Sequence, residues 1–184
     1  MLKDLIKQNR SVRKYVQTVS VSRETLVELV DLARLSASGG NRQALKFMLS
    51  WEPERNAVIF KHIGLAGNPA EGEQPSAYII ILGDTQIAKE YGVDPGIAAQ
   101  SMLLGATEKG LGGCMIGMIN RKRLHQAFNI PSRYEIVLIV SFGQPKEGFV
   151  IEDAEKDSLS TRGWWDEKGI RHVPKRKLEE LIVE

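Results

Sequence analysis

The sequence lacks the cysteines that a disulfide framework or a cysteine-rich metal site needs. Cys114 is the sole cysteine, and the three histidines, His62, His125 and His172, are far apart along the chain. One thiol cannot close an intramolecular disulfide, and no Cys/His cluster has metal-ligand spacing. The composition therefore predicts no bound metal, and the single thiol suits a reducing compartment.

Long apolar runs and a strong excess of charge are also missing. No apolar stretch approaches the roughly 20 residues that a membrane-spanning helix needs, and the segment Met1–Asp4 lacks the apolar core of a signal peptide. The formal net charge is only +2, so no global field favours nucleic acid. These absences predict a cytoplasmic protein that binds neither a membrane nor nucleic acid.

The 184 residues suffice for a single domain with a sizeable core, which we expect to span residues 1–184. Apolar spacing and capping residues predict helices over 2–9, 22–36, 94–109 and 121–128, with shorter ones around 56–63 and 175–182. Apolar runs predict strands over 45–51, 77–82, 112–118 and 135–142. Because these elements interleave without a βαβ rhythm, the order favours an α+β fold with a central sheet.

Two segments carry finer expectations. Asp94 and Pro95 predict a helix start, with Asp94 as the N-cap carboxylate and proline at the first helical position. Residues 52–75 are rich in proline and glycine, and the tail from Lys146 is polar. We expect the former to be an irregular lid or partner contact, and the latter to stay irregular up to the last helix.

A basic run lies near each end of the chain, Arg10-Ser11-Val12-Arg13 and Val173-Pro174-Lys175-Arg176. Guanidinium groups suit bidentate phosphate recognition, so the two runs could converge on one phosphate. The alternative for either run is a solvated surface cluster. Lys175 and Arg176 would open the last helix, where cations are mildly unfavourable, and this conflict suggests a nearby anion.

Two further segments lie between these runs: Ser38-Gly39-Gly40-Asn41-Arg42-Gln43, and the stretch from Gly110 to Met118. The first could be only a loop, and the glycines at the start of the second could be only a helix stop. These glycines are not a dinucleotide-binding fingerprint, because they follow a predicted helix and precede a predicted strand, the reverse of that motif's order. Cys114 is expected to be a small core residue rather than a nucleophile, and His172 a structural or surface residue.

In this order and spacing, the four segments resemble the nitroreductase family of FMN-dependent oxidoreductases. The resemblance extends to Asp94–Gln100, to the turn Gly143–Pro145, and to Gly72–Tyr78, which is typical of a short branch of the family. It implies a three-layer α-β-α fold with a mostly antiparallel central sheet. It also implies an intertwined homodimer with FMN at the interface.

The resemblance assigns roles at the FMN phosphate and at the flavin ring. From the N-terminal and C-terminal sides, the phosphate would be held by Arg10, Ser11, Arg13, Lys175 and Arg176. The partner subunit would lay Ser38, Asn41 and Gln43 over the ring, and the strand end Met115, Ile116, Gly117 and Met118 would run along it. The backbone N–H of Gly117 would point at flavin N5, and Asp94 would lie near the ring.

Two positions depart from the family pattern. Asn9 stands where members often have a second arginine, and Gln43-Ala44-Leu45 stands in place of Gln-Pro-Trp. The implied activity is hydride transfer from NAD(P)H through flavin N5 to a nitroaromatic, a quinone or a similar acceptor. Two alternatives stay open: other flavin redox chemistry such as dehalogenation or flavin breakdown, and a flavin sensor or store without turnover.

Overall fold

The computed structural model describes residues 1–183 and divides them into two compact units that meet in sequence at Pro145 and Lys146. The first unit holds a four-stranded antiparallel sheet in the order β1-β2-β4-β3. Its strands are β1 (Leu45–Ser50), β2 (Ala77–Asp84), β3 (Gly112–Ile116) and β4 (Tyr134–Gly143). The expected single domain over 1–184 stays a prediction.

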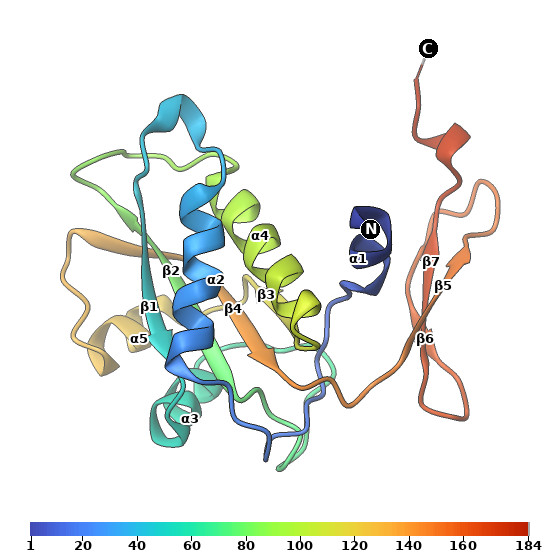
Figure 1. Ribbon diagram of the computed structural model, residues 1–184, viewed down its shortest axis with the longest axis horizontal. Helices are drawn as coiled ribbons and strands as arrows, with labels where there is room; N and C mark the ends of the chain where they lie inside the picture. The colour runs from blue at the N-terminus through green and yellow to red at the C-terminus, as the bar shows by residue number, and fades with distance from the viewer. Residues whose placement is uncertain (184) are drawn as a thin grey trace. The chain divides into compact units, whose positions relative to one another are not determined.

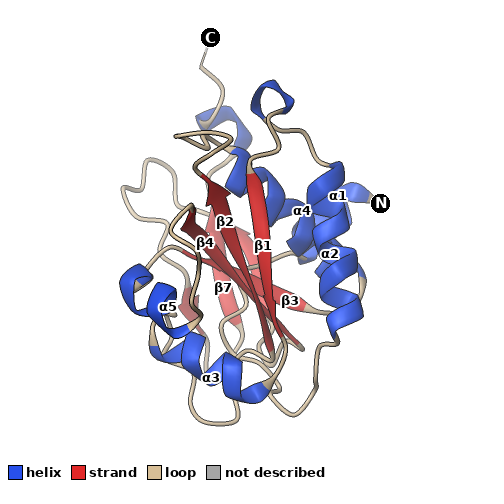
Figure 2. Ribbon diagram, turned by 90° about the vertical axis from the view of Figure 1, so that its left-hand side faces the viewer, coloured by secondary structure: helices blue, strands red, loops and turns tan. Residues whose placement is uncertain are grey.

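The first unit also contains five helices, four of which cover the two faces of this sheet. They are α1 (Leu2–Gln8), α2 (Arg23–Leu35), α3 (Pro53–Lys61), α4 (Asp94–Glu108) and α5 (Arg121–Ala127). Figure 2 shows α2 and α4 on one face of the sheet and α3 and α5 on the other. The expected three-layer arrangement around a mostly antiparallel sheet is confirmed.

Strand β2 is the centre of the core. All eight of its residues are buried, as its unbroken apolar run predicts. Ile79 and Ile81 pack in one apolar cluster with Leu29 of α2 and Met102 of α4. The two helices lie side by side over the sheet (Figure 1). Burial of this cluster removes large apolar side chains from water, which is the main force that holds the layers together.

Helix α2 begins where the sequence predicts. The Ser22 hydroxyl accepts a hydrogen bond from the backbone N–H of Thr25 at 3.1 Å, so Ser22 is the N-cap. Helix α4 differs by one residue: Val93 is its N-cap and Asp94 lies in the first turn. The Asp94 carboxylate instead accepts a hydrogen bond from the backbone N–H of Gly39 at 2.9 Å. The N-cap expectation for Asp94 is therefore wrong, because a residue distant in sequence takes its oxygen.

The short helix expected around 56–63 is present as α3, which occupies Pro53–Lys61 within the 52–75 segment. Strand β3 ends at Ile116, two residues short of the expected end. Beyond it, Ile119 pairs with Ile63 in an isolated antiparallel bridge, and the N–H of Gly64 donates to the Met118 carbonyl at 2.8 Å. After Ile116 the chain leaves β4, because its backbone pairs with Ile63 and Gly64 instead.

The second unit contradicts two expectations about the C-terminal tail. It forms a three-stranded sheet of β5 (Phe149–Asp153), β7 (Arg171–Lys175) and β6 (Trp164–Trp165), in that order, with β5 and β7 parallel. The expected helix near 175–182 is only a single 3₁₀ turn, Leu178–Glu180. Local spacing could not reveal strands whose pairing partners lie some twenty residues away. Among residues 1–183, none of the helices combines the length and apolarity needed to cross a membrane.

Candidate functional site

The basic run near the N-terminus lies against the start of β3. Ser11 pairs with Gly113 in an isolated parallel bridge, and the Val12 N–H donates to the Gly113 carbonyl at 3.0 Å. A Cβ on Gly112 would lie 2.5 Å from Val12 Cγ2, so only glycine allows this approach. Gly110 does end α4, with φ of 73°. The helix-stop reading therefore holds for that glycine alone.

A residue that the sequence analysis missed holds this run in place. Tyr15 is fully buried, and its hydroxyl donates to the Val12 carbonyl at 2.7 Å. The same oxygen lies 2.9 Å from Ser141 Oγ on β4. A buried tyrosine needs partners for its hydroxyl, and here they tie Val12 to the sheet. The sequence signal that could have revealed this role is an aromatic residue, Tyr15, that closely follows the basic run and lies outside any predicted helix.

The two guanidinium groups of the run are held close to the backbone. Arg10 donates to the carbonyls of Ile6 and Asn9 at the end of α1, each at 2.5 Å. Partial burial lowers the pKa of Arg10 from its ordinary value. Arg13 Nη1 donates to the Ser11 carbonyl at 3.1 Å. Two guanidiniums and a hydroxyl thus occur within four residues on a fixed segment, a donor set that fits a phosphate group.

Asn9 has a structural partner of its own. Its side-chain amide donates to the Leu103 carbonyl at 3.0 Å and to Thr107 Oγ1 at 2.9 Å, both on α4. Asn9 therefore fastens the end of α1 to α4. Where the family often has an arginine, this chain uses the position to fix the helix that precedes Arg10.

The other end of β3 offers room for a flat ligand. Ile116 is buried, whereas Met115 is 37% exposed and Met118 is 74% exposed. A Cβ built on Gly117 would meet no atom within 4 Å, so the space beside this backbone is open. The segment is held by the hydrogen bond between Gly64 N–H and the Met118 carbonyl. A planar ring could approach the Gly117 backbone closely, which fits the role that the resemblance implies.

The loop over residues 38–43 has a strained backbone. Gly40, Asn41 and Gln43 all have positive φ, at 58°, 54° and 51°. Such conformations cost non-glycine residues on the order of 1 kcal/mol each, and they persist only where the surroundings impose them. Besides the bond from Gly39 to Asp94, the Gln43 side chain donates to Asn41 Oδ1 at 3.2 Å, and the Gln43 N–H donates to Ser38 Oγ at 3.4 Å. Strain of this kind is typical of a binding loop.

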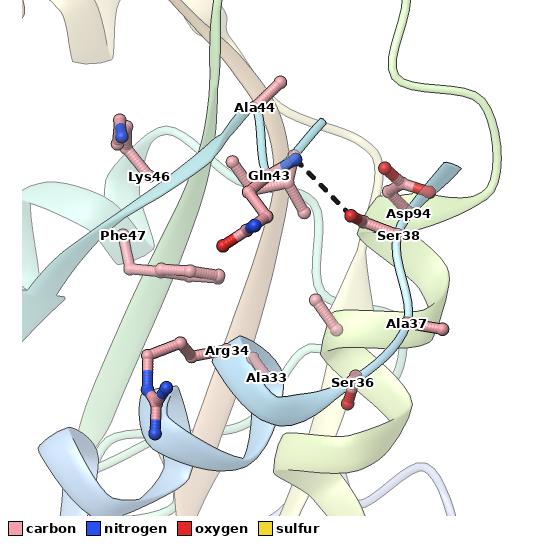
Figure 3. A pocket seen from close by; sticks show the side chains of 12 residues that line it. Ala33, Arg34, Ser36, Ala37, Ser38, Gln43, Ala44, Lys46, Phe47 and Asp94 are labelled. Carbon is pink, nitrogen blue, oxygen red and sulfur yellow. Dashed lines mark hydrogen bonds between the residues drawn. The ribbon is translucent and has the colours of Figure 1, made fainter. Parts of the chain in front are cut away.

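A pocket of about 220 Å³ lies beside this loop (Figure 3). Ser38, Gln43 and Asp94 line it together with Phe47 from β1 and Arg34 from α2. The structure therefore brings three of the expected site residues, two from this loop and one from α4, to one pocket. Ala44 and Leu45 also line this pocket. Because Leu45 stands where the family pattern has a tryptophan, the pocket lacks an indole ring and should differ in shape.

Lys175 and Arg176 belong to the second unit. Lys175 ends β7, and its carbonyl accepts a hydrogen bond from the Ala154 N–H at 2.7 Å. Arg176 Nη1 lies 3.8 Å from a Glu180 carboxylate oxygen. Because Lys175 is in a strand, the argument from a cation at a helix N-terminus is wrong for it. The convergence of these two residues with Arg10 stays a prediction.

Two other expectations concern residues outside this constellation. Cys114 is buried at 5% exposure, as expected of a core residue. His172 has a structural environment, between Glu152 and Asp166 and stacked on Trp164. Within residues 1–183, no three His, Cys, Asp or Glu side chains gather closely enough to hold a metal ion.

The sequence and fold were compared with known proteins. The model of the nitroreductase family matches residues 6–74 and 74–144. The Bacillus subtilis (strain 168) protein provisionally named NAD(P)H nitroreductase YodC is 25% identical over 181 residues, which cover 77% of this chain and 88% of that protein. Two solved structures share the fold.

The first is an FMN-dependent nitroreductase from Clostridium difficile R20291, with 25% identity and a TM-score of 0.67 over 83% of this chain and 91% of that one. The second is a nitroreductase family protein from Streptococcus pneumoniae TIGR4, with 16% identity and a TM-score of 0.72 over 100% of both chains. The family match spans most of the first unit, including the basic run, the strained loop and β3. The chain belongs to the nitroreductase family.

Proposed function

We propose that the protein is an FMN-dependent NAD(P)H oxidoreductase that reduces a small acceptor such as a nitroaromatic or a quinone. The observation that carries this proposal is the pair of features at the two ends of β3. The backbone of Ser11, in the basic run, pairs with Gly113, and open backbone follows at Gly117. At about 3.3 Å per residue, these glycines are roughly 13 Å apart, the extent of a small cofactor rather than of one ion.

At the phosphate end, Arg10, Ser11 and Arg13 would supply charge-assisted hydrogen bonds to an FMN phosphate, which carries close to two negative charges. Lys175 and Arg176 would approach the same phosphate from the second unit. The arginines would exchange bonds to backbone carbonyls for bonds to an anion. Tyr15 supports this end, because its hydroxyl fixes the Val12 carbonyl between the two arginines.

At the ring end, FMN supplies hydride chemistry at N5 when it is bound. The backbone N–H of Gly117 would hydrogen-bond that atom, and this N–H is the group we assign a catalytic role. Met115, Ile116 and Met118 would flank the ring. No side-chain acid, base or nucleophile is required of the chain, because its tasks are to bind, to orient and to exclude water.

The loop with Ser38, Asn41 and Gln43 would cover the ring of the partner's site in a homodimer, with Asp94 holding the loop through Gly39. The strained backbone at Asn41 and Gln43 supports this role, since strain is found where a binding geometry is imposed. A cofactor held by two chains makes each monomer incomplete.

The visible absorption spectrum tests this function directly. The purified protein is loaded with FMN, desalted, and treated anaerobically with NADH and then with NADPH. We expect a retained flavin band that bleaches with at least one nucleotide. A retained band that bleaches with neither would favour a flavin sensor or store, or a different electron donor. A protein that keeps no flavin would refute the proposal.

The phosphate end has its own test. The double variant Arg10→Ala/Lys175→Ala should lose FMN on desalting while its circular dichroism stays that of a folded chain. The matched control Lys3→Ala/Lys168→Ala removes one exposed lysine from each unit and should keep FMN. Full occupancy in the first variant would show that the phosphate lies elsewhere.

A further inference from the structure

A second pocket, open to solvent, lies next to the end of β3 that precedes Gly117. Its volume is about 570 Å³, and its lining comes from Lys61–Gly64 and from Met118–Arg121. Met118 directly follows Gly117, so the pocket borders the proposed flavin position. Three of the lining residues, Lys61, His62 and Arg121, can carry a positive charge. The lining contains no aspartate or glutamate.

Backbone pairing makes the floor of this pocket rigid. The N–H of Asn120 donates to the His62 carbonyl at 2.8 Å, and Ile63 pairs with Ile119 between the two segments. His62 is therefore fixed at the junction of α3 with the segment after β3. Its imidazole can report directly on what enters the pocket.

Arg121 is fixed by the sheet rather than by a counter-ion. Its Nε donates to the Ile136 carbonyl at 2.8 Å, and its Nη2 donates to the Val137 carbonyl at 3.2 Å. Both acceptors are neutral. In the part of the chain that the structure describes, neither Lys61 nor Arg121 has a carboxylate within salt-bridge distance.

Further basic residues lie on α3, which ends at Lys61 of the pocket lining, and on α5, which begins at Arg121. Lys122 and Arg123 continue the run at the start of α5, and both are exposed. Arg55 of α3 lies over the Phe128 ring at 4.9 Å, at the contact between α3 and α5. A concave surface with one sign of charge concentrates ligands of the opposite sign.

We propose that this basic pocket binds an anionic group, a phosphate or a carboxylate, of a substrate that reacts at the Gly117 end of β3. This inference rests on the proposed function, because Gly117 and Met118 connect the pocket to the flavin position. Lys61 and Arg121 would pair with the anion, and Asn120 would add a neutral contact. The anion could belong to the nicotinamide nucleotide or to the electron acceptor.

Binding is tested without turnover, with inorganic pyrophosphate as the probe. The FMN-loaded protein is titrated while the imidazole nitrogens of its three histidines are followed by NMR. We expect the His62 signal to shift with saturation, and the signals of His125 and His172 to stay in place. A His62 signal that does not move would overturn the proposal.

Charge variants sharpen this titration. Lys61→Gln should weaken pyrophosphate binding about tenfold, as expected for the loss of one charge-assisted hydrogen bond. Lys61→Arg should restore most of it. Lys89→Gln removes another exposed lysine, one that does not line the pocket, and it should have no effect. An equal loss in Lys61→Gln and Lys89→Gln would refute a specific site.

Steady-state kinetics then identify the source of the anion. If the nucleotide carries it, Lys61→Gln lowers kcat/KM for NADH or NADPH and leaves the acceptors unaffected. If the acceptor carries it, the variant lowers kcat/KM for 4-nitrobenzoate and spares the neutral nitrobenzene. Equal values for every substrate would overturn the proposal. Wild-type protein that is not bleached by either nucleotide would refute the proposed function instead, and the His62 titration would still decide the pocket.

Discussion

Gly112 begins β3, Gly117 directly follows its last residue, and the two glycines have opposite surroundings. A Cβ on Gly112 would contact Val12 at 2.5 Å and Pro145 at 2.9 Å, whereas a Cβ on Gly117 would meet nothing within 4 Å. The first glycine is needed by the packing of the chain against itself. The second leaves space that the chain does not fill, and an unfilled space beside a fixed backbone is what a bound ring requires.

The two glycines can be separated by alanine substitution. Gly112→Ala should destabilise the protein by about 1–3 kcal/mol, because the added methyl group overpacks against Val12. Gly117→Ala should leave the stability of the FMN-free protein within about 0.5 kcal/mol, typical of a surface change, yet weaken FMN binding. Chemical denaturation and FMN titration measure both effects. If Gly117→Ala binds FMN as tightly as the wild type, the ring does not lie against this backbone.

At the scale of elements, His172 links the three strands of the second unit. Its Nδ1 lies 2.9 Å from a carboxylate oxygen of Glu152 on β5, and its Nε2 lies 3.6 Å from Asp166, just after β6. Its ring stacks on Trp164 of β6 with centroids 3.9 Å apart. Trp164 also donates to Glu152 at 3.1 Å. One imidazole thus connects two strands to the β7 that precedes Arg176.

This cluster should make the second unit sensitive to pH. The hydrogen bond to Glu152 raises the pKa of His172 above its ordinary 6.5, so the stabilisation is full below pH 6.5 and is lost as the pH rises through the raised pKa. The pKa of Glu152 is lowered from 4.5 by its bond to His172, and that of Asp166 is lowered from 3.8 by the backbone N–H of Ile170. Their contributions are lost as the pH falls below these values. The cluster is therefore strongest between pH 4.5 and 6.5.

Hydrogen exchange of the β6 and β7 amides, corrected for intrinsic rates, measures this dependence. We expect the greatest protection in the stated window and a decline on either side. His172→Phe keeps a ring to stack on Trp164 but has no titrating nitrogen, so its protection should not decline between pH 6.5 and 9. An unchanged decline in that variant would show that another group controls the unit.

At the scale of the whole molecule, the proposed site joins parts of the chain that are far apart in sequence. In this proposal the phosphate ligands would come from the first fifteen residues and the last ten, and the covering loop would come from a partner chain. Binding of FMN and association of two chains should then stabilise each other by mass action. The isolated monomer would hold the cofactor only weakly.

Thermal unfolding tests this coupling. FMN at a hundred times its Kd should stabilise the protein by about 2.7 kcal/mol, which corresponds to a rise in Tm of roughly 5–10 °C. With FMN present, the Tm should also rise with protein concentration. A Tm that rises with FMN but stays constant over a hundredfold range of protein concentration would show that one chain binds the cofactor without a partner.

The sequence by itself determined the elements whose cause is local. The apolar run Ala77–Leu82 could only be a buried strand, and Ser22 with the apolar spacing after it determined α2. The order of the motifs identified the family, and with it the three layers. For the strand and the helix the physical signal, an apolar run or a cap with apolar spacing, is contained within about fifteen neighbouring residues, whereas the motif order is read along the whole chain.

Tertiary structure alone decided the features that depend on distant partners. The second unit became a sheet because β5 and β7 pair across twenty residues, which turned an expected helix at Lys175 into the end of a strand. Asp94 turned from its own helix to Gly39, and Tyr15 became the support of the basic run. The basic pocket exists only where Lys61–Gly64 meets Met118–Arg121. Free energy from such contacts arises between segments, so no local pattern in the sequence records it.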